Sequence, residues 1–235
     1  MSPAARKPAV PTDGGGYDAT PFLPDGGGLD AYRKAAASCR GCPLFERATQ
    51  TVFGAGDASA RIVLVGEQPG DQEDRQGEPF VGPAGRLLHK ALDEAGLGGE
   101  PAYVTNAVKH FKYTRQEGGK RRIHKPPSLR ETHACRPWID AELRLLSPGV
   151  IVALGATAAK ALLGPSFRVS KDRGTPLPLV PRRGEDEAPA GADGAAPVVA
   201  TLHPSAVLRA TDREAVYAGV VADLGVAADV LAGAR

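Results

Sequence analysis

The sequence contains few cysteine and aromatic residues and no long uncharged apolar run. It has 235 residues, of which 3 are cysteine and 1 is tryptophan. Charge-free apolar stretches, such as residues 150–159, are shorter than the roughly 18 residues that cross a bilayer, so we expect no membrane-spanning helix. No apolar run follows Arg6 and Lys7, which argues against a secretory signal and for a cytoplasmic location. An odd number of cysteines in that reducing compartment favours a metal or cluster site over a disulfide framework.

Hydrophobic residues make up 42% of the chain and charged residues 24%, which is typical of a globular protein with a core. The net charge is +2, but seven lysines and arginines stand between residues 109 and 125, with Glu117 as the only acidic residue among them. This basic segment is locally +6, and the remainder of the chain is about −4. Such a segment fits neutralisation of nucleic-acid phosphates, although a solvated charge run is the commoner outcome.

The order of apolar segments predicts an α/β protein. Strands are expected at residues 61–66, 102–108, 149–154 and 198–202. Helices are expected at 84–95, at 128–146 with a kink or restart at Pro137, and from a capping box at 211–214. Their alternation favours a single-domain three-layer sandwich with a central, mostly parallel sheet. The breaker-rich residues 1–28 are expected to be a disordered tail, and residues 29–235 the domain, with a surface loop at 181–197.

Ligands of parallel sheets bind beyond the carboxyl ends of the strands. Four segments follow such ends: residues 66–71, the stretch from Thr105 onward, the basic segment up to His124, and residues 201–205. The first is glycine-rich but lacks the residues of a phosphate-binding loop and the spacing of a dinucleotide fingerprint, so nucleotide cofactor binding is poorly supported. It presents carboxylate and amide groups instead, although an ordinary solvated turn remains an alternative.

The pair Cys39 and Cys42 forms a C-x2-C motif, whose thiolates can share one metal ion or cluster edge. Cys135 supplies a third thiolate. His133 lies two residues away on the same expected helix, roughly 200° around its axis, so His110 is the better fourth ligand. Spacing alone does not separate zinc from iron and sulfur, and three small core residues are the alternative.

His124 stands among cations near an expected strand end. A neutral imidazole in that place can act as a nucleophile or a base, whereas an isolated histidine in a loop is more often a surface residue.

Several motifs in one order resemble the uracil-DNA glycosylase superfamily, and in particular its iron-sulfur family-four group. They are Gly-Glu-Gln-Pro-Gly at 66–70, Glu-Pro-Phe-Val-Gly-Pro-Ala-Gly at 78–85, Thr-Asn-Ala-Val-Lys at 105–109 and His-Pro-Ser at 203–205. Lys-Arg-Arg-Ile-His at 120–124 is similar to the hallmark insertion of the UdgX branch. Gln68, in place of the group's usual alanine, points the same way.

The resemblance implies that uracil is flipped from DNA into a pocket and cut from its sugar. Phe80 would stack on the base, Asn106 would bond its Watson–Crick edge, and His203 would donate to uracil O2. His124 would attack C1′ and remain attached to the DNA, with Glu67 orienting it. The implied catalytic residues are Glu67, Gln68, His124 and His203, and the implied uracil-binding residues are Gln68, Asp71, Phe80, Asn106 and His203.

The resemblance also implies a 4Fe-4S cluster of structural role. Family-four members use four cysteines, whereas this chain has His110 at one of those positions; the implied ligands are Cys39, Cys42, His110 and Cys135. The implied DNA-binding residues are Lys120, Arg121, Arg122, Lys125, Ser205 and Arg209. The expected partner is uracil-containing DNA, preferably single-stranded, bound by a monomer. An ordinary multiple-turnover glycosylase and a non-catalytic cluster-bearing nucleic-acid binder or redox sensor are the alternatives.

Overall fold

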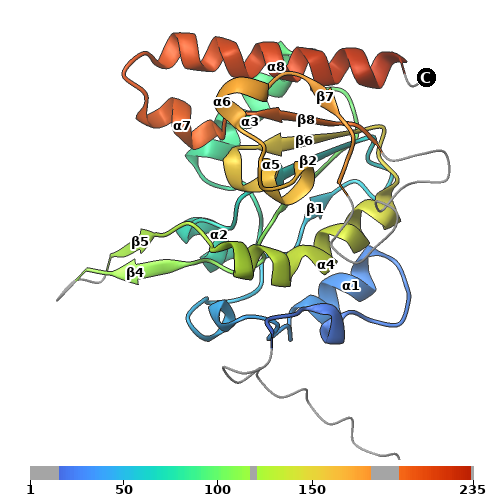
Figure 1. Cartoon of the computed structure of the whole chain (residues 1–235), viewed down its shortest axis with the longest axis vertical. Helices are drawn as coiled ribbons and strands as arrows, with labels where there is room; N and C mark the ends of the chain where they lie inside the picture. The colour runs from blue at the N-terminus through green and yellow to red at the C-terminus, as the bar shows by residue number, and fades with distance from the viewer. Residues whose placement is uncertain (1–15, 117–120, 181–195, 234–235) are drawn as a thin grey trace, which may run out of the picture.

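A computed structural model of the chain describes residues 16–116, 121–180 and 196–233. A six-stranded sheet in the order β1-β3-β2-β6-β8-β7 forms its centre (Figure 1). The four inner strands are parallel, and the two-residue edge strands β1 and β7 are antiparallel to their neighbours. The strands are β1 (Ala55–Gly56), β2 (Ile62–Gly66), β3 (Ala102–Asn106), β6 (Val150–Leu154), β7 (Pro176–Leu177) and β8 (Val198–Thr201).

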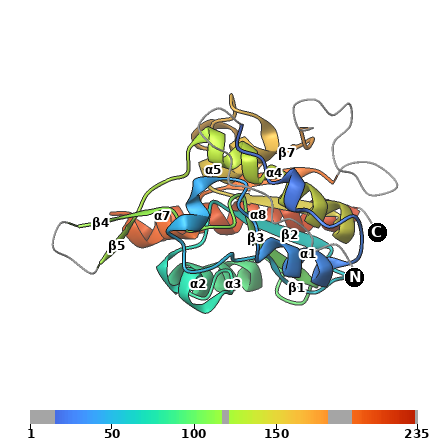
Figure 2. The same cartoon turned by 90° about the horizontal axis from the view of Figure 1, so that it is seen from below.

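Helices cover both faces of the sheet, because the inner strands are apolar on both sides. In β2, Ile62 and Leu64 pack into one core cluster, while Val63 and Val65 pack into another. Figure 2 shows α4 and α5 on one side of the sheet and α2 and α3 on the other. The helices are α1 (Leu29–Ala36), α2 (Asp71–Gln76), α3 (Pro83–Glu94), α4 (Leu129–Leu146), α5 (Ala156–Leu163), α6 (Val169–Asp172), α7 (Pro204–Arg209) and α8 (Arg213–Gly233). The predicted three-layer α/β fold is therefore confirmed.

Helix α8 is, by length and composition, apolar enough to cross a membrane, with a hydropathy of 1.7. Val220, Leu224, Ala227 and Leu231 are buried in the core cluster that includes β6 and β8. A core helix that covers a sheet passes the same composition test, and Figure 1 shows α8 lying along the sheet. The packing therefore accounts for its apolar composition.

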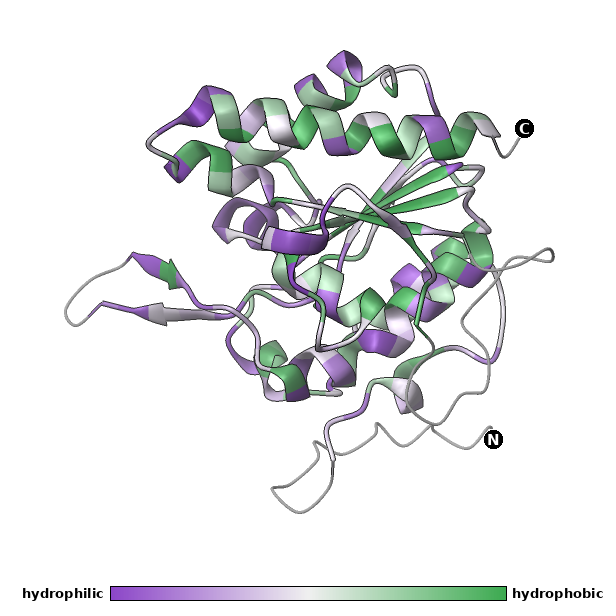
Figure 3. Ribbon diagram, turned by 45° about the horizontal axis from the view of Figure 1, so that its top comes forward, coloured by the Kyte–Doolittle hydropathy of each residue, from purple (hydrophilic) through white to green (hydrophobic). Residues whose placement is uncertain are grey.

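The basic segment forms a two-stranded antiparallel ribbon, made of β4 (Tyr113–Arg115) and β5 (Arg122–His124), where the sequence suggested a loop. It projects from the body of the molecule (Figure 1), and Figure 3 shows it as mostly polar beside the apolar central strands. Its strands are too short and too polar for apolar alternation to identify them. We call this element the ribbon.

Residues before the expected boundary at residue 28 already pack into the fold. Ala19 is 1% exposed, and its backbone N–H donates to the carbonyl of Ala134 on α4. Two short 3-10 helices, Thr20–Phe22 and Pro43–Glu46, continue this segment on either side of α1. Residues 1–15 of the expected tail and 181–195 of the expected surface loop lie outside the described residues.

Helices α4 and α8 differ in detail from the prediction. Helix α4 starts with the predicted capping box of Ser128 and Glu131, and it runs from Leu129 to Leu146 with Pro137 inside it, so it does not restart at the proline. Helix α8 begins at Arg213. The side chain of Asp212, rather than that of Thr211, accepts a hydrogen bond from the first turn.

Candidate active site

A cleft of about 830 Å³ opens beyond the carboxyl ends of the parallel strands, where the topology predicts a ligand site. Its walls come from the ends of β2, β3 and β6, the ribbon, and the start of α7. The lining includes Glu67, Phe80, Asn106, His124, Ser205 and His203. These residues lie far apart in the sequence, and the resemblance implies different roles for them. They nevertheless line one cavity.

An aromatic ring and an amide lie close together in this cleft. Phe80 is 9% exposed and Asn106 is 3% exposed. A Cβ atom on Gly66 would lie 2.4 Å from Asn106 Oδ1 and 2.7 Å from Phe80 Cζ, so only glycine at the end of β2 lets both side chains approach. Phe80 has a φ of 57°, a costly conformation for a phenylalanine that is characteristic of functional sites.

His203 is held as a neutral imidazole with a defined tautomer. The backbone N–H of Ser205 donates to Nδ1 over 3.1 Å, and the Ser205 hydroxyl lies 2.8 Å from the same nitrogen. Because Nδ1 accepts, the proton of the neutral ring is on Nε2. Burial lowers the pKa of His203 to about 4, which keeps the ring neutral at pH 7. Its ring stacks against Phe80 with 6.2 Å between centroids.

Glu67, the residue after β2, joins the ribbon to the sheet. Its Oε1 lies 3.2 Å from Nε2 of His124, and its Oε2 accepts a short hydrogen bond from the hydroxyl of Thr157 on α5. Burial by itself would raise the pKa of Glu67, but the hydrogen bonds from His124 and Thr157 lower it overall. The carboxylate is therefore ionised and fixes the direction of the imidazole ring.

Gln68 fixes the base of the ribbon. Its amide nitrogen donates to the carbonyls of Lys112 and Lys125, and its amide oxygen accepts from the N–H of Lys112. Both amide protons are thus used to join the two ends of the ribbon. Gln68 lines the cleft, as the expected role in uracil binding requires, but its hydrogen bonds go to the ribbon.

Arg122 fixes the side of the ribbon, which differs from the expectation that it binds DNA phosphate. Its guanidinium pairs with Asp71 and with Asp74, and it lies over the ring of Tyr113 at 5.0 Å. The side chain is 6% exposed, so phosphate has little access to it. Side chains alternate along a strand, so Arg122 and His124 extend to the same side of β5. Anchoring Arg122 to α2 therefore directs His124 toward Glu67.

Asp71, an expected uracil-binding residue, lines the cleft while pairing with Arg122 and Arg75. Its partner in anchoring the ribbon, Asp74, is fully buried, and its carboxylate also accepts from the backbone and the hydroxyl of Thr49. Asp71 and Asp74 of α2 therefore both hold the ribbon through Arg122.

Three cations of the basic segment are neutralised within the fold. Lys109 is fully buried with Nζ 2.5 Å from Glu142 Oε2, and Lys112 Nζ lies 2.8 Å from Glu131. Arg122 has its two aspartates. The charge of +6 counted from the sequence is therefore larger than the positive charge that a polyanion meets. The carboxylates that neutralise these cations lie far away in sequence. Lys120 lies outside the described residues, and the exposed cations are Arg115, Arg121 and Lys125.

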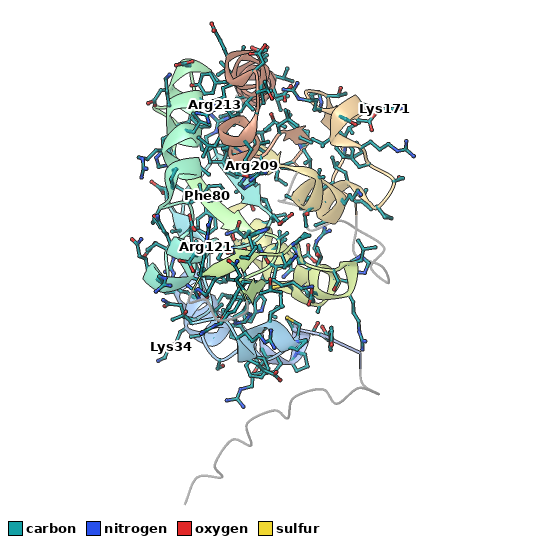
Figure 4. All side chains as sticks on the ribbon, turned by 90° about the vertical axis from the view of Figure 1, so that its left-hand side faces the viewer. Lys34, Phe80, Arg121, Lys171, Arg209 and Arg213 are labelled. Carbon is teal, nitrogen blue, oxygen red and sulfur yellow. The ribbon has the colours of Figure 1, made fainter. Side chains whose placement is uncertain are left out.

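Exposed cations flank the cleft on the ribbon side of the molecule. Figure 4 shows Phe80 between Arg209 and Arg121, with Arg213 and Lys171 on the same face. Arg209 lines the cleft at the end of α7. Ser205, an expected phosphate ligand, uses its hydroxyl on His203 instead.

The three cysteines share one buried core cluster with Trp138 and the N-terminal segment. The indole N–H of Trp138 donates to Cys39 Sγ, and the backbone N–H of Lys109 donates to Cys135 Sγ, each over 3.3 Å. Burial raises the pKa of all three thiols, that of Cys42 to about 11, and the negative charge of a neighbouring thiolate adds to the shift for Cys42 and Cys135.

The two histidines considered as a fourth ligand, His110 and His133, differ in burial. His110 is 4% exposed, with Nε2 2.9 Å from the hydroxyl of Thr51, whereas His133 is exposed. Within the described ranges, no three His, Cys, Asp or Glu side chains converge as ligands of a single metal ion. Three thiols and an imidazole are donor types that both zinc sites and iron-sulfur clusters use.

Comparison with known proteins shows which family the chain belongs to. Residues 53–225 match the family described as the uracil DNA glycosylase superfamily. The chain belongs to this superfamily. A Type-4 uracil-DNA glycosylase of Thermotoga maritima is 36% identical over 187 residues, which are 79% of this chain and 86% of that protein.

Two archaeal proteins show the same likeness over a shorter part of the chain. The Type-4 uracil-DNA glycosylase of Archaeoglobus fulgidus is 39% identical over 56% of this chain and 62% of its own length. That of Sulfurisphaera tokodaii is 34% identical over 62% of this chain and 64% of its own length. The family match at residues 53–225 spans all six strands of the sheet and the residues that line the cleft.

Sequence patterns gave no indication of Thr157, Asp74 or Glu142. Thr157 stands in a short apolar helix, and Asp74 and Glu142 resemble solvated helix carboxylates in the sequence. Glu142 has Asp140 and Arg144 two positions away on either side, so its neighbourhood in the sequence gives no sign that it is buried.

The anchoring of the ribbon can be tested by comparing Arg122→Gln with Arg121→Gln. Arg122→Gln leaves the buried Asp74 without its ion-pair partner and should lower the free energy of unfolding by about 3 kcal/mol. Arg121 is exposed, and its replacement should change stability by less than about 0.5 kcal/mol. Urea unfolding measures both values, and equal stabilities would show that the Arg122 pairs do not hold the ribbon.

Proposed function

We propose that this protein excises uracil from DNA and becomes covalently linked to the abasic sugar through His124. The observation that carries the proposal is the place of His124, which lines the cleft of Phe80, Asn106 and His203 while its ring faces Glu67 at 3.2 Å. The superfamily membership and the Type-4 relatives support uracil excision. The ribbon adds a nucleophile to that pocket.

Base recognition falls to Phe80 and Asn106. Phe80 offers a buried aromatic face on which a flipped base stacks. The amide of Asn106 both donates and accepts, and so matches O4 and N3–H of uracil, whereas cytosine presents a donor and an acceptor in the opposite places. The deeply buried amide would be left unsatisfied by the wrong base, which supports discrimination.

Bond cleavage falls to His203. Breaking the bond between C1′ and N1 leaves its electron pair on uracil, and negative charge develops on O2. A neutral imidazole with its proton on Nε2 can donate a hydrogen bond to that oxygen. The Ser205 backbone N–H holds the opposite nitrogen and so fixes the donor.

Capture of the sugar falls to His124. The sugar left behind is an oxocarbenium-like cation, which an ordinary glycosylase leaves to water. Glu67 accepts the N–H of the ring nitrogen that faces it, so the lone pair lies on the opposite nitrogen and can form a bond to C1′. One molecule would then complete one excision.

DNA would cross the cleft over the face shown in Figure 4. Arg121 and Arg209 stand on opposite sides of Phe80, as required of cations that hold the strand on either side of a flipped base. Single strands avoid the cost of unpairing the base, which favours them as substrate.

Cys39, Cys42, His110 and Cys135 would hold a 4Fe-4S cluster. When bound, such a cluster supplies structural cross-linking here, since cleavage of a glycosidic bond transfers no electron from the protein. The chain's own residues support that role: Lys109 donates its backbone N–H to Cys135 and its ammonium to the carbonyl of Asn106.

Replacing the nucleophile tests the covalent step. His124→Ser should release uracil at a rate within about threefold of the wild type but leave free abasic DNA, because water replaces the imidazole. A denaturing gel with a labelled uracil oligonucleotide separates the products. Protein-linked DNA from His124→Ser, or many uracils released per wild-type molecule, would contradict the assignment, and the latter would identify an ordinary multiple-turnover glycosylase.

The protonation state of His203 predicts the pH dependence of excision. Its pKa is lowered to about 4, so the ring stays neutral as the pH falls from 8 to 5. Protonation of Nδ1 would break its hydrogen bond from Ser205. We expect uracil release by His124→Ser to vary less than about threefold over that range, where a histidine of ordinary pKa, about 6.5, would become mostly protonated. A tenfold loss centred near pH 6.5, measured in single-turnover assays, would refute this.

Metal analysis tests the cluster. We expect iron and acid-labile sulfide in equal amounts in the anaerobically purified protein, and a loss of both in Cys135→Ser together with lower thermal stability. Ser38→Ala, an exposed change beside Cys39, is the matched control. Zinc in place of iron, or unchanged iron content in Cys135→Ser, would argue against the cluster.

A further inference from the structure

We infer that Thr157 is a positioning residue that decides how often His124, rather than water, captures the sugar. The inference rests on the proposed function and extends it to a residue that contacts neither base nor sugar. Its basis is the short hydrogen bond from the Thr157 hydroxyl to Glu67, on the opposite carboxylate oxygen from His124.

The topology places Thr157 beside Glu67. Strand β6 pairs with β2 in parallel, so the turns that follow the two strands lie side by side. Glu67 is the first residue after β2, and Thr157 is the second residue of α5, which follows β6. The first turn of a helix points its unpaired donors toward the strand end, a setting that favours a carboxylate.

The turn before Thr157 has little room to move. Gly155 has a φ of 91°, and a Cβ atom there would lie 3.0 Å from Cβ of His203. Its N–H donates to the carbonyl of Thr201 over 2.8 Å. The turn that leads into Thr157 is therefore fixed against the end of β8 and the start of α7.

Both oxygens of Glu67 are committed, which removes its rotational freedom. Oε2 accepts from Thr157, so Oε1 faces His124, and the side chain of Glu67 is only 23% exposed. Without the hydroxyl, the carboxylate could turn and bind water on either oxygen. The imidazole would then lose the acceptor that directs its lone pair, although it would still lie in the cleft.

The alignment of Glu67 matters in the covalent step. The imidazole lone pair forms the N–C1′ bond, while the C1′–N1 electron pair leaves with uracil, which takes a proton from solvent. The positive charge passes from the sugar to the ring, and the ring proton that faces Glu67 is shared with, or transferred to, its carboxylate. A carboxylate held by Thr157 is aligned to stabilise that charge as it forms.

Base release should depend little on Thr157. The residues proposed to hold and charge-stabilise the base are Phe80, Asn106 and His203, and none of the hydrogen bonds of Thr157 goes to them. A loss of alignment at His124 therefore appears as a change in product partition, with more free abasic DNA and less adduct, at a similar rate of uracil release.

The experiment measures that partition in Thr157→Val and Thr157→Ser. Each variant is mixed in excess with a labelled single-stranded uracil oligonucleotide; uracil release and protein-linked DNA are followed over the same time course. Thr157→Val should lower the ratio of adduct to free abasic DNA by about tenfold, the effect of one hydrogen bond to a charged group. Thr157→Ser, which keeps the hydroxyl, should stay within about threefold of the wild type.

Two controls separate positioning from a general effect. Thr132→Val removes a hydroxyl that donates to a backbone carbonyl near the start of α4, and it should leave the ratio unchanged. In a Glu67→Gln background, Thr157→Val should have little further effect, because the two residues act through one contact. An additive loss in the double variant would overturn the inference.

The outcomes also distinguish this inference from the proposed function. Uracil release without adduct from the wild type would refute the covalent function and this inference with it. Adduct from the wild type, with the same ratio in Thr157→Val, would refute the role of Thr157 alone. Equal loss of uracil release and adduct in Thr157→Val, or loss of adduct in Thr157→Ser as well, would likewise overturn the role of its hydroxyl.

Discussion

The contact between Glu67 and His124 is the interaction on which the proposed chemistry of this cleft depends, and the surrounding structure maintains it. His124 stands on a two-stranded ribbon, which would be marginally stable by itself. The residues next to the pair supply the missing stability: Gln68 bonds both ends of the ribbon, and Arg122 fixes its side to α2. A side chain 48% exposed in the free protein thereby keeps a defined direction.

Buried charge in this molecule serves alignment. A lone ammonium with the environment of Lys109 would be strongly disfavoured, and the pair with Glu142 is tolerated because hydroxyls and a backbone N–H complete its hydrogen bonds. Lys109 bonds to the carbonyl of Asn106 through its side chain and to Cys135 through its backbone. One residue thus connects Cys135 with the backbone of Asn106, so the buried cysteines and the cleft belong to one hydrogen-bonded unit.

Sequence patterns predict the centre of this fold and not its margins. Short apolar runs rich in β-branched residues identify β2, β6 and β8, because strands buried on both faces carry apolar residues at consecutive positions. The two-residue strands β1 and β7, and the polar strands of the ribbon, carry too few residues for a period of two to be recognised. The resemblance to known motifs named the residues that line the cleft, since these motifs follow the strand ends.

The roles of individual charges depend on partners that local sequence does not reveal. Arg121 and Arg122 are adjacent and identical, yet one is exposed and the other is held by carboxylates about fifty positions earlier in the chain. A basic segment read as a phosphate site is therefore in part the anchor of a ribbon. Thr157 is a further case, because an apolar helix gives no sign that one hydroxyl faces a carboxylate across two strands.

In the proposed reaction, the competition between imidazole and water is the reason for the many contacts that maintain one ring. A cation formed in an open cleft meets water at once, and a histidine on a mobile ribbon would arrive too late to compete. Holding a nucleophile in its reactive geometry can raise its effective concentration to about 10⁵ M or more, far above that of any solvent. The ordering cost is met on folding, by Gln68, Arg122 and the Glu67–Thr157 contact, and not at the moment of reaction. In the proposed reaction these anchors, as much as the histidine itself, separate a covalent trap from a glycosylase that releases its product.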